Sequence, residues 1–304
     1  MAGKIAIIGA GSVGTATAFA LAIDGTPDEV VLVDLNLAKA QGEIMDIEHA
    51  NAFIPYTEFT ASKSYRAIKD ADIVVITAGA AQKPGQTRRD LIGVNRKILK
   101  SIIAEVKRYA PKSILLIVTN PVDALTYFAK KDSGFPTHRV IGTGTTLDSA
   151  RFRSLLAKRF KVNARHVHAY ILGEHGDASF PVLSNAHVAS IPLASLPGYK
   201  AAEMKALAKK AATVVYEIIK KKGATNLAIA ICVREIVNAI LNNSHEIFPV
   251  SSVLQGEYGL KNVAISTPSI LGRKGIIQEL EIPLNAEEKQ ALKKSVNILR
   301  SLIR

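Results

Sequence analysis

The first half of the chain alternates short apolar runs with longer amphipathic segments. Runs rich in Ile and Val predict strands at residues 4–9, 30–34, 73–77, 114–120 and 140–142. Because these runs are continuously apolar, they favour parallel strands that are covered on both faces. Helical periodicity lies between several of them, for example over residues 13–23 and 94–109. This rhythm predicts an α/β domain with a doubly wound parallel sheet.

The pattern changes after residue 143. Helices are predicted near residues 146–160, 200–222 and 226–241, with a final capped helix from 286 to the end. Short strands are predicted near residues 166–172, 248–254, 263–270 and 276–282. This mixture is typical of an α+β domain. We therefore expect an N-terminal domain over residues 1–143 and a C-terminal domain over residues 144–304.

The chain is globular in composition but strongly basic. Hydrophobic residues make up 48% of its 304 residues and charged residues 21%, and the net charge is +13. Such a charge raises the possibility of a nucleic-acid or anionic-surface partner. However, the lysines are scattered over predicted helices opposite apolar stripes, and no aromatic residues are interleaved with them. A solvated basic face, which also attracts anionic substrates, is the better interpretation, and we expect no nucleic-acid or membrane partner.

Cysteine and apolar-run content fit a cytoplasmic protein. The single cysteine, Cys232, excludes an intrachain disulfide and is interpreted as a small buried hydrophobe. The apolar run that follows Lys4 is too short for a signal peptide. No run approaches the roughly 18 apolar residues of a membrane span.

A glycine-rich loop follows the first predicted strand. Residues 9–14 read Gly-Ala-Gly-Ser-Val-Gly, and a helix is predicted directly after them. Glycines in this Gly-x-Gly-x-x-Gly pattern allow a tight turn and close approach of a pyrophosphate to the helix N-terminus. Asp34 ends the next strand, where a carboxylate accepts hydrogen bonds from ribose hydroxyls and repels a 2′-phosphate. The sequence therefore predicts a Rossmann-type site for NAD rather than NADP.

Two further segments end predicted strands. Residues 77–80 read Thr-Ala-Gly-Ala, and residues 118–121 read Val-Thr-Asn-Pro. Open α/β sheets bind ligands at the carboxyl ends of their strands. Small residues there let a dinucleotide lie close to the backbone.

Several ionisable residues suit proton transfer on a small anionic hydroxy acid. His175 lies in the segment Gly-Glu-His-Gly-Asp, and the unperturbed pKa of histidine, about 6.5, suits acid/base work. Asp148 and Arg151 share one face of a predicted helix and offer a carboxylate for the histidine and a guanidinium fork for a substrate carboxylate. Taken alone, that pair is more often an ordinary ion pair. A second arginine, Arg88, ends a Gly/Pro-containing segment that starts at Gln82.

We expect no metal site. His166 and His168 are interpreted as two histidines on the same face of a strand, and no cysteine or carboxylate ligands cluster with them in the sequence.

Taken together, these motifs resemble the L-lactate/malate dehydrogenase family, and specifically bacterial-type L-lactate dehydrogenases. The resemblance covers essentially the whole chain, in this order: residues 9–14, Asp34, 82–88, 119–123, 148–153, 173–177, Thr225 and 256–259. It implies a reversible, NAD-dependent interconversion of L-lactate and pyruvate in fermentative glycolysis.

The resemblance also implies a role for each site residue. His175 is the proton donor and acceptor, Asp148 orients it, Arg151 binds the substrate carboxylate, and Arg88 polarises the carbonyl from a mobile lid. The implied substrate-binding set is Gln82, Arg88, Asn120, Asp123, Asp148, Arg151 and Thr225. The implied NAD-binding set is Gly9, Gly11, Ser12, Val13, Gly14, Asp34, Lys39, Tyr65, Gly79, Ala80, Ser101, Val118, Thr119, Asn120, Thr143 and Ile229.

Gln82 bears on substrate choice. Malate-type relatives place an arginine there to pair with a second carboxylate, whereas a neutral glutamine would leave that carboxylate desolvated and unpaired. This favours pyruvate, although Lys83 or Arg89 could also reach into the pocket. After Thr225 the family's usual bulky aromatics are replaced by Asn226 and Leu227. The sequence therefore leaves open how tightly the pocket rejects longer 2-oxo acids.

Arg153 and His168 match positions at which bacterial relatives bind fructose 1,6-bisphosphate between subunits. The resemblance implies an allosteric homotetramer or a dimer–tetramer equilibrium. Two other functions remain open. One is an enzyme of this fold acting on malate or a larger 2-hydroxy acid, and the other is a basic, nucleic-acid-binding protein that retains a dehydrogenase scaffold.

Overall fold

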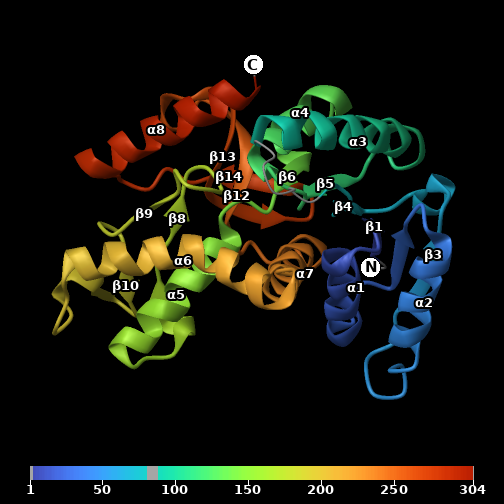
Figure 1. Cartoon of the computed structure of the whole chain (residues 1–304), viewed down its shortest axis with the longest axis horizontal. Coiled ribbons are helices and arrows are strands. Elements are labelled where there is room, and N and C mark those ends of the chain that lie inside the picture. Colours follow the sequence, from blue (N-terminus) through green and yellow to red (C-terminus); the bar gives the residue numbers. More distant parts are fainter. Residues whose placement is uncertain (1–2, 81–87, 304) are drawn as a thin grey trace.

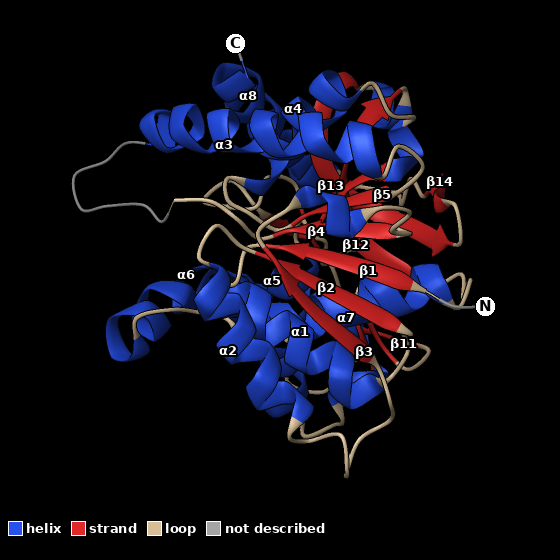
Figure 2. Ribbon diagram, turned by 90° about the vertical axis from the view of Figure 1, so that its right-hand side faces the viewer, coloured by secondary structure: helices blue, strands red, loops and turns tan. Residues whose placement is uncertain are grey.

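The computed structural model describes residues 3–80 and 88–303. Within them, nine strands form one mixed sheet in the order β14-β13-β12-β6-β5-β4-β1-β2-β3. The parallel part comprises β1 (Lys4–Ile8), β2 (Glu29–Val33), β3 (Glu58–Ser62), β4 (Ile73–Ile76), β5 (Ile114–Ile117) and β6 (Val140–Gly142). The predicted doubly wound α/β fold is confirmed (Figures 1 and 2).

The sheet continues into the second half of the chain. The antiparallel strands are β12 (Ile247–Gln255), β13 (Lys261–Gly272) and β14 (Gly275–Glu279). β12 joins the parallel part by pairing antiparallel with β6, where Ser251 lies opposite Gly142. One sheet therefore carries elements from both halves of the chain.

Helices cover both faces of this sheet (Figure 2). Their bounds are α1 (Ser12–Asp24), α2 (Leu37–Glu48), α3 (Arg88–Tyr109), α4 (Val122–Ser133), α5 (Thr146–Phe160), α6 (Ala201–Lys222), α7 (Leu227–Leu241) and α8 (Ala286–Ile303). Short 3-10 helices are η1 (Tyr65–Ile68), η2 (Thr137–Arg139), η3 (Ala164–His166), η4 (Leu193–Ser195) and η5 (Glu257–Gly259).

The predicted single strand over residues 166–172 is wrong. His166 belongs to η3, and the segment then forms β7 (Val167–His168) and β8 (Ile171–Leu172), which enter different sheets. β7 pairs with β10 (His187–Val188), which also pairs with β11 (Ile191–Pro192), whereas β8 pairs with β9 (Phe180–Pro181). The two histidines therefore do not share a strand face, because His166 lies in η3 and only His168 lies in a strand.

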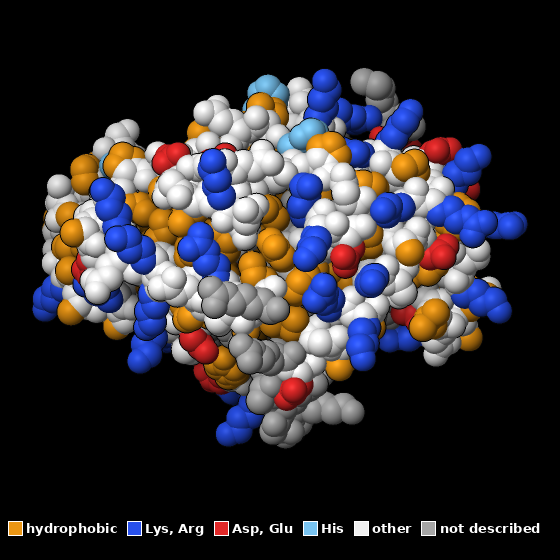
Figure 3. Space-filling view, turned by 90° about the horizontal axis from the view of Figure 1, so that it is seen from above, with side chains coloured by type: hydrophobic (Ala, Val, Ile, Leu, Met, Phe, Trp, Pro, Cys, Tyr) orange, Lys and Arg blue, Asp and Glu red, His pale blue; other side chains and the backbone are white. Residues whose placement is uncertain are grey.

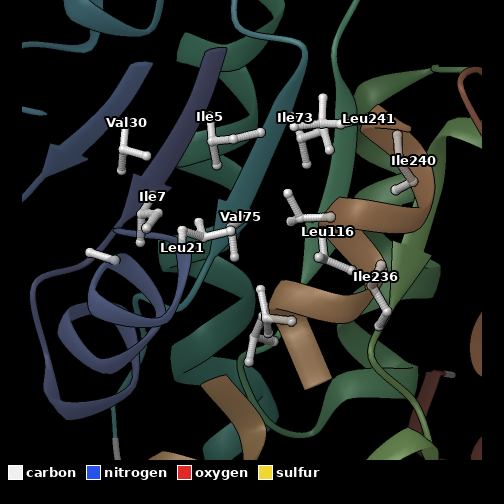
Figure 4. Packing of buried hydrophobic residues seen from close by; sticks show 14 of the residues in the cluster. Ile5, Ile7, Leu21, Val30, Ile73, Val75, Leu116, Ile236, Ile240 and Leu241 are labelled. Carbon is white, nitrogen blue, oxygen red and sulfur yellow. The ribbon is translucent and has the colours of Figure 1, made fainter. Parts of the chain in front are cut away.

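Two apolar cores lie on the two faces of the parallel sheet. Along β1, Ile5 and Ile7 belong to the core under α1, α2 and α7, while Ala6 and Ile8 belong to the core under α3 and α4. This double burial is the physical reason that the strand runs are apolar throughout. Figure 4 shows Ile236, Ile240 and Leu241 of α7 beside strand residues of the first core. A helix from the C-terminal half thus completes the N-terminal core.

Basic side chains are spread over the surface. On the face that carries α3, α4 and α8, Lys and Arg are separated by apolar and uncharged groups (Figure 3). This spacing agrees with a solvated basic face. In the part of the chain that the structure describes, no helix is long and apolar enough to cross a membrane.

We expect the α7 contribution to the core to be measurable. Ile236 is fully buried, whereas Ile231 on the same helix is 44% exposed. Ile236→Ala should lower the free energy of unfolding by about 2–5 kcal/mol through lost burial and a cavity. Ile231→Ala is the control and should change it by less than about 1 kcal/mol. Urea denaturation followed by circular dichroism measures both, and equal effects would show that α7 does not complete this core.

Candidate active site

The glycine-rich loop forms a backbone cradle between β1 and α1. Gly9 has φ +111°, a conformation that L side chains rarely adopt. A Cβ on Gly14 would lie 1.8 Å from the Gly9 carbonyl oxygen, whereas one on Gly11 would meet no atom within 4 Å. Glycine is therefore required where helix and strand pack, and space stays open beside Gly11. Gly11, the N-cap of α1, has no side chain to cap the helix, which begins at Ser12 and Val13, so this end fits an anionic phosphate group.

Asp34 braces this loop from the end of β2. Its Oδ2 accepts a hydrogen bond from Ala10 N–H (2.7 Å), and its Oδ1 accepts one from Asn36 N–H (2.8 Å). A carboxylate oxygen accepts more than one hydrogen bond, so both oxygens retain capacity for ribose hydroxyls. The residues present therefore fit a dinucleotide.

Asn95 connects the segments that follow β4 and β5, and the sequence analysis missed it. This buried α3 side chain accepts from Ala80 N–H (2.7 Å) and donates to the carbonyl oxygens of Ala80 (3.2 Å) and Asn120 (2.8 Å). Gly79 is required beside it, since a Cβ there would lie 2.2 Å from Thr119 Cγ2. The only local signal was an amide on a helix face that is otherwise apolar.

The other expected cofactor residues lie around the same edge. Val118 and Thr119 follow β5, and Thr143 follows β6, each at the carboxyl end of a parallel strand. Burial, together with the Glu105 and Asp34 carboxylates, raises the pKa of the Tyr65 hydroxyl. Lys39 on α2 and Ser101 on α3 are exposed.

His175 and Asp148 form the central pair. His175 Nδ1 lies 2.6 Å from Asp148 Oδ2. Asp148 is in the first turn of α5, and Ser149 beside it exchanges hydrogen bonds with the backbone of Ile171. After β8 the chain turns at Gly173, whose φ is +93° and where a Cβ would lie 2.7 Å from Ser295 Oγ. The helix and the turn thereby bring the two side chains together.

Arg151 binds the other oxygen of the same carboxylate. Its Nη1 lies 3.4 Å from Asp148 Oδ1, and the two side chains are 13% and 6% exposed. The i,i+3 ion pair therefore exists, but it is largely buried and is extended by His175 into a triad. Such an arrangement differs from a solvated surface pair.

Asp123 holds the His175 backbone from the other side. Its Oδ2 accepts a hydrogen bond from His175 N–H (2.7 Å). Burial raises the pKa of Asp123 to about 6, against the lowering effects of Ser251 and His175. In this structure Asp123 therefore contacts the histidine segment. Because it also lies in the first turn of α4, it ties His175 to the segment that carries Asn120.

The triad favours a protonated imidazole. Burial would lower the pKa of His175, but the adjacent Asp148 carboxylate raises it, to about 9. Burial would raise the pKa of Asp148, but His175 and Arg151 hold it below its usual range. The site thus presents a proton donor and a guanidinium together, a combination suited to protonating a bound anion.

α7 packs against α5, the helix that carries Asp148 and Arg151. Thr225 precedes this helix and Ile229 lies in its first turns, partly buried against the first core. Cys232, one turn further, is buried, and its pKa is raised to about 12 by burial, with Arg151 and Asp148 close enough to affect it. The interpretation of Cys232 as a buried structural residue is confirmed.

Gln82 lies outside the described residues, as do Lys83 and most of the expected lid. Arg88 is described only as the first residue of α3.

Arg153 and His168 lie apart from this triad. Arg153 Nη2 donates to Ala164 O (3.3 Å), while its buried Nε has no hydrogen-bond partner among the described residues. His168 is exposed on β7, opposite His187 of β10. Within the described residues, no group of three or more His, Cys, Asp or Glu is placed to hold a metal ion.

Family models match nearly the whole chain. Residues 3–142 match the lactate/malate dehydrogenase NAD-binding domain, and residues 145–304 match the lactate/malate dehydrogenase alpha/beta C-terminal domain. The chain belongs to the lactate/malate dehydrogenase family. As a member of this family it is an NAD-dependent oxidoreductase.

Its similar relatives are bacterial. It is 46% identical to an L-lactate dehydrogenase of Acetivibrio thermocellus over 99% of this chain and 96% of that one. It is also 46% identical to one of Thermoanaerobacter pseudethanolicus, over 99% and 98%. Two solved structures, a lactate dehydrogenase from a Medee basin deep-sea metagenome and the minor L-lactate dehydrogenase of Enterococcus mundtii, each superpose with a TM-score of 0.95 at 38% identity. Each comparison covers 99% of this chain and 98% of the other.

We expect Asp148 to control the protonation of His175. In Asp148→Asn the burial that disfavours the imidazolium is no longer opposed, so the pKa of His175 should fall from about 9 to near or below its unperturbed value of about 6.5. NMR titration of the histidine rings in the ligand-free protein measures this change. His187, whose Nδ1 contacts the Asn185 carbonyl, is the internal control. An unchanged His175 titration would contradict the assignment.

Proposed function

We propose that this chain is an L-lactate dehydrogenase that interconverts L-lactate and pyruvate. The observation that carries the proposal is the buried triad, in which one Asp148 carboxylate binds both His175 and Arg151. The names of the bacterial relatives support the same activity.

Bound NAD supplies the hydride acceptor, and NADH the donor. His175 takes the hydroxyl proton as lactate is oxidised and returns it as pyruvate is reduced. Asp148 holds the imidazole ring in orientation through Nδ1 and stabilises its charged form. Arg151 binds the substrate carboxylate in a bidentate manner, since its planar guanidinium matches two oxygens.

The remaining roles complete the proposal. Asn120 hydrogen-bonds the substrate carbonyl oxygen, Arg88 polarises it, and Thr225 lines the pocket. We assign the cofactor phosphates to the loop Gly9–Gly14 and the adenosine ribose to Asp34. Residues 1–143 then form the NAD-binding domain and residues 144–304 the substrate domain. The resemblance further supports a role in fermentative glycolysis in the cytoplasm.

Substrate choice is expected to depend on Gln82. NADH oxidation by the unmodified protein should be faster with pyruvate than with oxaloacetate, because a neutral glutamine stands where malate-type relatives place the arginine that pairs the second carboxylate. Gln82→Arg should raise kcat/KM for oxaloacetate by about tenfold or more. Lys83→Gln is the control and should leave the preference unchanged. If the unmodified protein prefers oxaloacetate, an enzyme acting on malate replaces the proposed L-lactate dehydrogenase. If the arginine variant gains no oxaloacetate activity, Gln82 does not determine substrate choice.

We also propose activation by fructose 1,6-bisphosphate at Arg153 and His168. The buried Nε of Arg153, which has no hydrogen-bond partner among residues 3–80 and 88–303, and the exposed ring of His168 support an anion site. A bisphosphate bridging cationic groups of two subunits would relieve their mutual repulsion and favour a tetramer.

Saturating fructose 1,6-bisphosphate should raise both activity and the tetramer fraction in analytical ultracentrifugation. Arg153→Gln or His168→Gln should abolish both responses without changing the basal rate. His187→Gln, at the cross-strand neighbour of His168, should keep them. An unmodified protein that shows neither response would rule the effector out.

A further inference from the structure

α7 lies beside α1, the helix that follows the glycine-rich loop (Figure 1). At one end Asn226 Nδ2 donates to Ser12 O (3.3 Å), and at the other Asn238 Nδ2 donates to Asp24 Oδ2 (2.9 Å). Each contact joins residues that are 214 positions apart in the chain. Equal spacing at both ends requires two helices that run in the same direction and in register. Their N-termini therefore lie side by side.

Asn226 occupies the N-cap position of α7 but does not cap it. No side-chain cap hydrogen bond is made there, although Asn is among the preferred capping residues. Its amide instead bridges two other elements. Nδ2 donates to Ser12 O on the glycine-rich loop side, and Oδ1 accepts from Lys222 Nζ (2.8 Å) at the end of α6. The bridge places the Lys222 ammonium one amide side chain away from the Ser12 carbonyl in the first turn of α1.

A simpler role for Lys222 is stabilisation of its own helix. Lys220, Lys221 and Lys222 all lie in the last turn of α6, where cations interact favourably with the helix dipole. Lys221, however, pairs within α6 with Glu217 (2.6 Å). Lys222 is held by Asn226 toward another helix. The dipole accounts for the charge of these lysines but not for this orientation.

The first turn of α1, which Asn226 links to Lys222, carries the positive end of a helix dipole, and the nearby Asp34 carboxylate is hydrogen-bonded to Ala10 N–H before that turn. The first turn of α1 contains no acidic residue, and its N-cap, Gly11, has no side chain to accept the free N–H groups. An added ammonium would be unfavourable there unless an anion is bound between them. The loop assignment made above supplies that anion, the diphosphate of NAD.

We propose that Lys222, positioned by Asn226, is a phosphate-binding residue for the dinucleotide. It is contributed by the C-terminal half of the chain to a loop of the N-terminal half. The proposal rests on the assignment of the cofactor phosphates to Gly9–Gly14. Because Asn226 follows Thr225 directly, the same bridge links the phosphate end of the cofactor site to the substrate-pocket wall.

Binding of ADP-ribose tests the proposal without turnover. This compound has the diphosphate but no nicotinamide, whereas adenosine lacks the diphosphate and the terminal ribose, so only ADP-ribose offers phosphates to Lys222. Lys222→Met should raise the Kd for ADP-ribose by about fivefold to twentyfold, as expected for loss of one charge-assisted contact at an exposed site. Its affinity for adenosine should not change. Isothermal titration calorimetry measures both ligands.

Lys221→Met is the matched control, because it removes the same charge from the same turn of α6. It should change the Kd for ADP-ribose by less than about twofold. Lys222→Arg should largely restore binding, and Asn226→Ala should weaken it by less than Lys222→Met. The Kd should also depend less on salt in Lys222→Met than in the unmodified chain, since one ionic contact is gone.

Two results would overturn the proposal in distinguishable ways. Equal effects of Lys222→Met and Lys221→Met, or none from either, would leave Lys222 only its helix-dipole role. Failure of the unmodified chain to bind ADP-ribose would instead reject the loop assignment, and the proposal would fall with it. Circular dichroism of each variant separates lost binding from lost folding.

Discussion

The site depends on a close approach of backbone segments at Gly142 and Gly144, where the parallel and antiparallel parts of the sheet meet. A Cβ on Gly142 would lie 2.3 Å from Thr126 Oγ1 of α4, and one on Gly144 would lie 2.7 Å from Ser251 N of β12. Only glycine lets these elements touch. Asp123 lies one turn before Thr126 on α4, and the chain enters α5 and Asp148 directly after Gly144. Both carboxylates that hold His175 are therefore placed by this junction.

The charges gathered at this junction are arranged for an anionic substrate. Asp148 keeps its negative charge because a protonated His175 and Arg151 stabilise it, so these three groups together carry a net positive charge. Asp123 is a buried carboxyl with a pKa raised to about 6, so it offsets that charge above about pH 6 and leaves it in place below. Burial of so many ionisable groups costs stability unless they are paired. Ser149 Oγ accepts a hydrogen bond from Ile171 N–H, Thr145 Oγ1 donates one to Ile171 O, and Gly173 forms a β-bridge with Ser266. These contacts keep that pairing in place.

Local sequence patterns predict strands that are buried on both faces and turns that need particular residues such as glycine. The strands of the parallel sheet, the glycine-rich loop, Asp34 and the spacing of Asp148 and Arg151 were predictable for this reason. The strand Glu58–Ser62 was not, because it is a short edge strand with one buried residue. The division of residues 166–172, the role of Asn95 and the pairing of β12 with β6 depend on partners far away in the chain. Periodicity reports burial and does not name the partner.

The late position of α7 in the chain has a consequence for biosynthesis. Residues of this helix cover Ile73 and Leu116 in the first core (Figure 4), yet they follow those strands by more than a hundred residues. A nascent chain that has completed β5 therefore displays part of its apolar sheet face until α6 and α7 have left the ribosome. Contacts of such long sequence separation fold slowly and expose apolar surface to association in the meantime. The first core of the N-terminal half is therefore fully buried only after α7 has been synthesised and has packed on it.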